Sequence, residues 1–260
     1  MRLYKIRAML HSDFIVLTNS KWRLIEHLYL PITSLIIWAL FSASVKGFAA
    51  EAGLIILMVN IFWSFAYISQ AAVSQELNEE IWSGSFKQII STGITEFEYL
   101  FARMVLSLAV TTLIAGLMFG ITLFFFNVSL IAEKSLLITA FLGATFLASL
   151  GMATLVAAAM LTLGREYSFL SWSALQMFIL LSAPFYPVSI FPGAVQVIAA
   201  AMPYTNVFEG MRTLITSGSV PLHYVTNSWL IAAAYFVLSL PIYRYAFRRA
   251  RKTGALVRLT

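Results

Sequence analysis

Cysteine is absent from this 260-residue sequence, and charged residues are scarce. Without cysteine the chain can form no disulfide, carries no thiol nucleophile and has no ligand for a zinc-thiolate site. The phosphate-binding pattern G-x-x-x-x-G-K-[ST] is also missing, so the chain does not bind a nucleotide in the manner of that loop. The three histidines, His11, His27 and His223, are far apart in the sequence and indicate no clustered metal site.

The scarcity of charge points to a membrane protein. Charged residues make up 11% of the chain, hydrophobic residues make up 60%, and the mean hydropathy is +0.86. A soluble domain of this length would have too little polar surface to cover itself. The basic residues behind the net charge of +6 gather near the two ends beside apolar blocks, where such residues typically set topology. We therefore predict no nucleic-acid partner.

Apolar blocks near or above the roughly 17–25 residues that span a bilayer recur along the chain. They cover Leu28–Val45, Gly53–Ala72, Leu100–Phe126, Ser135–Leu163, a block from about Ser168 that Pro184 and Pro187 interrupt, and Trp229–Tyr245. We predict an all-α, polytopic membrane protein with six transmembrane helices in one domain, residues 28–247. An N-terminal amphipathic segment, residues 1–27, and a basic cytoplasmic tail, residues 248–260, flank this domain.

Two local patterns refine this picture. Apolar residues at steps of three and four predict an amphipathic helix over residues 1–20, which lies in the membrane interface or packs on a partner protein. These residues are Leu3, Ile6, Leu10, Phe14 and Leu17. In the third block, Gly116 and Gly120 have the small-xxx-small spacing that permits close helix approach.

The distribution of lysine and arginine predicts the orientation in the membrane. With both termini in the cytoplasm, 14 of the 17 basic residues lie in cytoplasmic segments, and only Lys46, Lys134 and Arg212 lie outside. This positive-inside asymmetry requires an even number of spans. We predict a multi-pass protein of the cytoplasmic (inner) membrane with both termini in the cytoplasm.

One polar segment, residues 75–99, interrupts the apolar blocks and carries glutamates at positions 76, 79, 80, 96 and 98. A charge at the bilayer centre costs about 2.5–3.5 kcal/mol, so we expect this segment to lie in water or against a protein. Its apolar residues recur at helical spacing, and Gly84 and Gly93 mark breaks. The pattern predicts a short cytoplasmic helix that docks on a partner, or a loop that folds back on the membrane surface.

Two stretches resemble membrane subunits of type-2 ATP-binding cassette (ABC) exporters. The first is GSFKQIISTGIT, residues 84–95, followed by Glu98 and Ala102-Arg103. The second is FYPVSIFP, residues 185–192, which continues through MPYT, residues 202–205, to EGMR, residues 209–212. The family usually has threonine at Ser85, proline at Gly93, and a glycine where this chain has Ala183-Pro184. The order of the two stretches and the predicted span count also match the family.

The resemblance implies a half-transporter. Two copies of this chain, or one copy and a related permease, would form the pathway, and two cytoplasmic ABC ATPase subunits would bind ATP and Mg²⁺ beneath them. The chain itself then has no cofactor and no catalytic residue. In this reading the polar segment is a coupling helix inserted into the ATPase, and the N-terminal helix braces the contact. The expected ATPase-coupling residues are Glu79, Glu80, Ile81, Trp82, Gly84, Phe86, Ile89 and Arg103.

Individual roles follow from residue chemistry. We expect Glu79 and Glu80 to pair with basic residues of the ATPase. Exposed ion pairs contribute only about 0–1 kcal/mol each, so apolar Trp82, Phe86 and Ile89 should supply most of the docking energy. Arg103, at the cytoplasmic mouth of the third span, anchors the helix or binds a lipid phosphate.

Polar residues inside two apolar blocks are candidates to line a pathway or to form interhelical hydrogen bonds, because polar groups in lipid need partners. They are Asn60, Ser64, Gln70, Ser173 and Gln176. The proline-rich stretch 184–212 has apolar runs too short to cross, which predicts re-entrant or surface helices on the outer side. Its marker residues are Pro187, Pro192, Pro203, Glu209 and Arg212. The i,i+3 spacing of the last two predicts a local ion pair.

Two other classes fit the residues less well. An ATP-independent channel or ion-coupled carrier typically places charged residues within its spans, and the predicted spans have none near their middle. An intramembrane protease of the CAAX type has paired glutamates like Glu79-Glu80, but Gly84 stands where its arginine follows. For an exporter, the expected cargo is an amphiphile such as a drug, a lipid or a lipid-linked glycan, and the residues do not choose among these.

Overall fold

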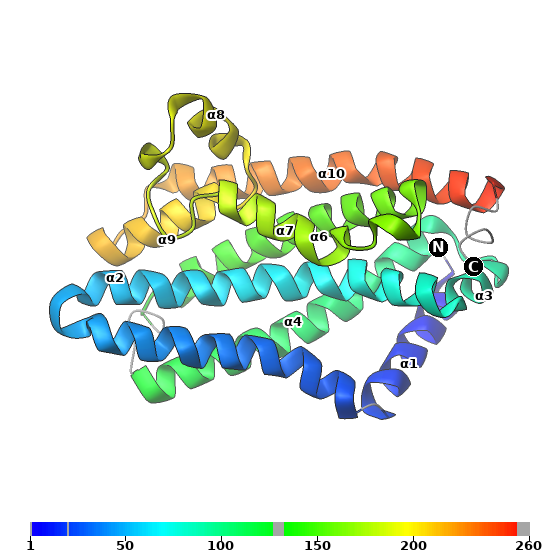
Figure 1. Ribbon diagram of the computed structural model, residues 1–260, viewed down its shortest axis with the longest axis horizontal. Coiled ribbons are helices and arrows are strands. Elements are labelled where there is room, and N and C mark those ends of the chain that lie inside the picture. Colours follow the sequence, from blue (N-terminus) through cyan, green and yellow to red (C-terminus); the bar gives the residue numbers. More distant parts are fainter. Residues whose placement is uncertain (1, 20, 127–132, 254–260) are drawn as a thin grey trace.

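The computed structural model describes residues 2–19, 21–126 and 133–253, and all regular structure within these ranges is helical. The long helices form an elongated bundle (Figure 1). The helices are α1 (Leu3–Asn19), α2 (Lys21–Ser83), α3 (Ser85–Ser91), α4 (Glu96–Phe126), α6 (Ser135–Leu163), α7 (Leu170–Leu181), α8 (Gly193–Ala201), α9 (Thr205–Ser217) and α10 (Leu222–Thr253), with 3-10 turns at Arg165–Tyr167 and Val188–Ile190. The predicted all-α class is confirmed.

Four helical segments of the described chain are long and apolar enough to cross a membrane. They are Glu51–Ser83 of α2, Glu96–Leu123 of α4, Ser135–Leu163, which is the whole of α6, and Leu222–Lys252 of α10. The predicted first and fifth spans correspond to two shorter apolar segments, Leu28–Ser44 and Leu170–Leu181. Every predicted block is therefore helical, and the count of six spans stays a prediction.

Helix α2 doubles back on itself, so that its two apolar stretches lie side by side (Figure 1). Asn60 Nδ2 donates a hydrogen bond of 2.7 Å to Ser34 Oγ on the other leg. Leu35 and Leu57, one from each leg, are buried in the same apolar cluster. The first two predicted spans thus form a helical hairpin. The helix begins at Lys21, and its first apolar segment begins at Leu28, as predicted.

Helices α6 and α10 pack closely against each other. A Cβ atom placed on Gly151 of α6 would lie 2.8 Å from the backbone nitrogen of Phe236 on α10, so only glycine fits there. The sequence pointed instead to Gly116 and Gly120, but no atom of another described helix lies within 4 Å of a Cβ placed on either residue. Both glycines are on the exposed face of α4, so the close approach that their spacing permits does not occur among the described residues.

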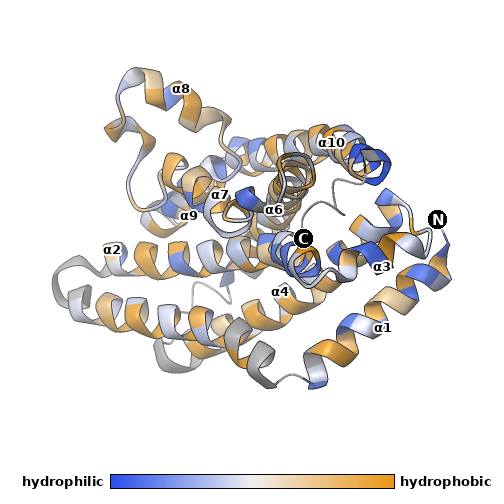
Figure 2. Cartoon of the chain, turned by 45° about the vertical axis from the view of Figure 1, so that its right-hand side comes forward, coloured by the Kyte–Doolittle hydropathy of each residue, from blue (hydrophilic) through white to orange (hydrophobic). Residues whose placement is uncertain are grey.

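The ends of distant segments meet around α3. A buried apolar cluster there includes Ile6 of α1, Leu77 of α2, Phe86 of α3, Tyr99 of α4 and Phe247 of α10. Figure 2 shows hydrophilic residues gathered near α3 and the C-terminal end of α10, while hydrophobic residues cover much of the length of the long helices. The polar segment identified in the sequence is thus packed against both the beginning and the end of the described chain.

Candidate functional site

Helix α3 is separated from its neighbours by two glycines in the left-handed region. Gly84 has a φ of 75° and Gly93 has a φ of 71°, which residues with a Cβ adopt only at an energetic cost. Gly84 lets the chain turn after α2 ends at Ser83, and Gly93 lets it turn again before α4. The two helix breaks predicted from the sequence are confirmed.

Helix α1 holds the far end of α3 through a lysine. Lys5 Nζ donates to the carbonyl oxygens of Thr92 and Gly93, at 2.9 Å and 2.8 Å. A cation at this position satisfies carbonyls that the helix end leaves unpaired and complements the helix dipole. The N-terminal helix therefore braces α3 directly. Ile6 and Met9 of α1 are buried in the same apolar cluster as Phe86 of α3, and their packing places Lys5 beside the end of α3.

The start of α4 carries a reciprocal cap that the sequence analysis missed. Thr95 N–H donates to Glu98 Oε2 at 3.0 Å, and Glu98 N–H donates to Thr95 Oγ1 at 3.3 Å. The pattern T-x-x-E over residues 95–98 is the signature of a capping box and was readable from the sequence. Glu98 Oε1 also accepts a 2.6 Å hydrogen bond from the Arg2 N–H, which ties α1 to α4.

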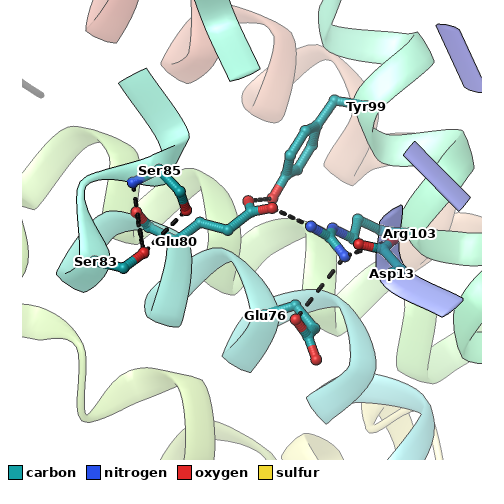
Figure 3. A network of polar contacts seen from close by, with 7 residues as sticks. All are labelled: Asp13, Glu76, Glu80, Ser83, Ser85, Tyr99 and Arg103. Carbon is teal, nitrogen blue, oxygen red and sulfur yellow. Dashed lines mark hydrogen bonds and ion pairs between the residues drawn. The ribbon is translucent and has the colours of Figure 1, made fainter. Parts of the chain in front are cut away.

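Five residues form an arginine hub at the junction of α1, α2 and α4: Asp13, Glu76, Glu80, Tyr99 and Arg103 (Figure 3). The guanidinium of Arg103 is 2.9 Å from Asp13 Oδ2 and 3.9 Å from Glu76 Oε2. It also forms an ion pair with Glu80, whose other carboxylate oxygen accepts a hydrogen bond from the Tyr99 hydroxyl. The Tyr99 ring lies 5.4 Å from Arg103 Cζ, within cation–π range.

The hub corrects the role expected of Glu80 and favours one of the two roles expected of Arg103. Glu80 is buried and bonded within the chain, so it does not present a carboxylate for a partner's basic residue. Arg103 is 1% exposed, so it anchors helices through ion pairs and does not reach a lipid phosphate. The sequence could not distinguish these roles, because the partners are 23 and 90 positions away from Arg103.

Phe86 is also placed differently from expectation. Its ring is 1% exposed and packs edge-on against Tyr99 and Phe247, with centroids 5.5 Å and 6.1 Å away. It therefore fixes α3 to the bundle and is not a docking residue in this structure. Trp82, in contrast, is 52% exposed, Glu79 is exposed, and Ile81 and Ile89 are half-buried.

The exposed members of the predicted coupling set border a large cavity. It has a volume of about 1090 Å³ and lies between α1, the end of α2 and α3. Tyr4 and Met9 line it from α1, and Glu79, Trp82 and Ile89 line it from the other side. The arrangement offers an aromatic side chain and a carboxylate beside a concave surface, which are features of a protein-binding site.

The candidate pathway residues lie in three different environments. Gln70 is fully buried and its Nε2 donates to the Ser171 carbonyl oxygen at 3.0 Å, so it joins α2 to α7. Asn60, Ser64 and Gln176 line a second cavity between the two legs of α2 and α7. Ser173 is half-buried and does not line that cavity.

The proline-rich stretch is organised by the predicted ion pair, which is confirmed. Arg212 Nη1 is 2.8 Å from Glu209 Oε2, and Glu209 Oε1 accepts a 2.9 Å hydrogen bond from Val188 N–H. Arg212 Nη2 donates to the carbonyl oxygens of Ala183, Pro184 and Tyr186 at 2.9–3.2 Å. The acidic-x-x-Arg ending of the motif thus shapes the loop that begins before Pro187.

Two prolines lie just before the helices α8 and α9. Pro192 precedes α8, and Pro203 lies in the two-residue-wide gap between the end of α8 and the cap of α9. Tyr204, at the start of α9, is buried, and its hydroxyl shares a 3.0 Å hydrogen bond with the hydroxyl of Ser149 on α6. Neither α8 nor α9 is long enough to cross a bilayer.

Within the described residues, no group of three or more histidine, aspartate or glutamate side chains could hold a metal ion.

The chain was also compared with known proteins. A family model described as ABC-2 type transporter matches residues 5–216, which include most of α1, all of α3, the arginine hub and the proline-rich stretch. No curated protein was found to match the chain.

Proposed function

The chain belongs to the ABC-2 type transporter family, which forms the membrane subunits of type-2 ABC transporters, and from this premise we propose that it is the permease of an ATP-driven exporter. A separate ABC ATPase binds ATP and Mg²⁺ and docks at the α3 end of the bundle. The cargo is an amphiphile such as a drug, a lipid or a lipid-linked glycan. Two permease chains, identical or related, and two ATPase subunits make up the transporter.

The main support for the proposal is the structure of the region around α3, which lies within the residues that match the family model. A short helix is framed by two glycines, and Trp82 and Glu79 are exposed beside a cavity of about 1090 Å³. An exposed tryptophan next to a concave surface is typical of an interface anchor. We assign the contact surface to Glu79, Ile81, Trp82 and Ile89, and leave out Glu80 and Phe86 because the side chains of these two residues are buried.

The contacts around α3 supply a route for coupling. Phe86 packs on Tyr99 of α4 and Phe247 of α10, and Lys5 of α1 binds the carbonyl end of α3. The arginine hub joins α1, α2 and α4 at the same place. A displacement of α3 by a closing ATPase pair would therefore move several long helices together, as rigid-body switching requires.

The proposal includes six spans in the cytoplasmic (inner) membrane with both termini in the cytoplasm. α1, α3 and the C-terminal end of α10 lie at one end of the bundle (Figure 1), which supports placing both ends of the chain on the ATPase side. Arg244 and Arg248 are half-exposed at that end, as the positive-inside rule favours for a cytoplasmic surface.

Co-purification tests the proposal. A tagged chain is purified from its source cells, and the preparation is tested for ATP hydrolysis and for a second chain that carries a phosphate-binding loop. We expect Trp82→Ser and Glu79→Arg each to reduce recovery of the ATPase, with Trp82→Ser weakening the association by about tenfold or more, because an interface tryptophan is a typical hot spot.

Controls come from the opposite end of the bundle, where Glu133 and Leu136 are also exposed. Glu133→Arg and Leu136→Ser repeat the charge reversal and the apolar-to-polar change, and should leave ATPase recovery unchanged. Full transport by the purified chain without ATP would refute the proposal. Equal losses in the test and control variants would place the ATPase elsewhere.

A further inference from the structure

The C-terminal end of α10 carries a basic surface that is separate from the contact surface assigned to the ATPase. The final turns of this helix contain no acidic residue and five basic ones: Arg244, Arg248, Arg249, Arg251 and Lys252. Clusters of this kind beside a membrane span are typical of segments that bind anionic lipids. Because basic residues at the end of a span also set topology, a lipid site requires in addition that particular side chains are placed to hold a head group.

Two of these arginines are held by a single carboxylate of α4. Glu96 is buried, and its Oε1 lies 3.3 Å from Nε of Arg244 and accepts a 2.9 Å hydrogen bond from Nε of Arg248. Arg244 Cζ also lies 5.9 Å from the centre of the Phe97 ring, within cation–π range. Both guanidinium groups are thus fixed at their Nε ends by the first turn of α4.

The outer donors of these two guanidinium groups are open to a ligand. A guanidinium has five N–H donors, and each of the two directs only its Nε at an acceptor in the part of the chain that the structure describes. The side chains of Arg244 and Arg248 are half-exposed. Since they share one carboxylate, the three side chains together carry a net charge of +1. Forked donors beside a net positive charge suit a phosphate group, which a guanidinium binds through two parallel hydrogen bonds.

An exposed apolar face leads from the two arginines along α10. Val237 and Pro241 are exposed, and they precede Arg244 at steps of four and three, which puts all three on one side of the helix. Arg248 follows one turn later, and the whole stretch belongs to the segment Leu222–Lys252 that is apolar enough to cross a membrane. From Val237 to Arg248 the helix rises about 16 Å, close to half the thickness of a hydrocarbon core. An acyl chain can therefore lie along this face while its phosphate is at the arginines.

We propose that Arg244 and Arg248 bind the phosphate of an anionic phospholipid at this end of the bundle, with an acyl chain along the exposed apolar face of α10. An anionic lipid supplies the negative charge that the two arginines lack, whereas a zwitterionic lipid carries a cation of its own in the same head group. Glu96 and Phe97 are positioning residues that hold the two guanidinium groups. The proposal involves neither the cargo nor the ATPase, so its test can fail while the exporter proposal stands.

Native mass spectrometry tests the site in the full chain, purified in detergent and titrated with dioleoyl phosphatidylglycerol or dioleoyl phosphatidylcholine. We expect the first bound phosphatidylglycerol to have a Kd at least about tenfold lower than that of phosphatidylcholine. Arg244→Gln and Arg248→Gln should each weaken phosphatidylglycerol binding about fivefold, the effect of one basic residue at an anionic membrane surface. Binding of phosphatidylcholine should not change in either variant.

Arg251→Gln is the matched control, because it removes the same charge from an exposed side chain of the same helix end that forms no ion pair with Glu96 among the described residues. It should change phosphatidylglycerol binding by less than about twofold, since exposed charges away from the head group are screened by salt. An equal loss in all three variants would mean that the surface attracts lipid by charge alone. Equal binding of the two lipids would mean that another occupant, such as an acidic segment of a partner protein, fits this surface. Either result overturns the inference.

Discussion

Arg103 joins three helices through charge, and replacing it with methionine removes the guanidinium while keeping an apolar stem of similar length. Asp13, Glu76 and Glu80 then lose the cation that they share. Removing one member of a buried ion pair typically costs about 3–5 kcal/mol, because the remaining charge stays buried. The Glu80 contact should dominate, since Asp13 and Glu76 are partly exposed and Glu76 is 3.9 Å away.

Thermal unfolding of the purified chain in detergent measures this loss. For a chain of this length, 1 kcal/mol shifts Tm by about 2–4 °C, so Arg103→Met should lower Tm by roughly 6–20 °C. Arg103→Lys should fall between methionine and the wild type, because an ammonium keeps the charge but loses the planar fork that reaches several carboxylates. Glu80→Gln should cost about 1–3 kcal/mol, as it removes the charge and keeps the shape.

Arg248 provides the control, since it pairs with Glu96 at 2.9 Å but its side chain is 55% exposed. Exposed pairs contribute about 0–1 kcal/mol, so Arg248→Met should shift Tm by a few degrees at most. The double variant of Arg103→Met and Glu80→Gln should cost less than the sum of the two single changes, because the two side chains share one interaction. A Tm for Arg103→Met within 2 °C of wild type, or strict additivity, would refute the account of the hub.

Two further predictions concern the helix ends. Lys5→Met should speed hydrogen exchange of the amides near Thr92 about fivefold, because α3 loses a cationic cap worth roughly 1 kcal/mol. Lys87→Met, a change on α3 itself, should have no such effect. Unchanged exchange in the Lys5 variant would show that α1 does not brace α3. Ala183→Gly should stabilise the chain by about 0.5–1 kcal/mol, because Ala183 has a φ of 51° that glycine adopts without strain. The control variant Ala199→Gly, inside α8, should destabilise the chain by a similar amount. Thermal unfolding measures both changes, and a loss of stability in both variants would contradict the strain at Ala183.

Ala183 lies where the sequence departs from the pattern of the family and where the backbone has a positive φ. Type-2 exporters usually have a glycine just ahead of this stretch, and this chain has Ala183-Pro184. Ala183 has a left-handed backbone although it is not a glycine, and its carbonyl oxygen accepts a hydrogen bond from Arg212 at 3.0 Å. A contact with a residue 29 positions away therefore helps to hold this turn.

Features that depend on local chemistry could be read directly from the sequence. The bounds of α6 match the predicted block Ser135–Leu163, because a long apolar run has one stable arrangement in a bilayer, a helix. Gly84 and Gly93 were predictable as breaks because only glycine adopts a positive φ without cost. The Glu209–Arg212 pair and the Thr95–Glu98 cap are also local, since their members are three positions apart.

Tertiary packing decided the rest. Whether Glu80 and Phe86 face a partner or the interior depends on Arg103, Tyr99 and Phe247, which approach from other helices. Gly116 and Gly151 sit in equally apolar helices, but only Gly151 meets a neighbouring backbone. Helical periodicity reports which residues share a face of one helix, whereas the contacts of that face depend on how the other helices pack against it. For that reason the sequence alone identified the chain as a membrane protein, whereas the roles of its charged and aromatic side chains depended on the tertiary structure.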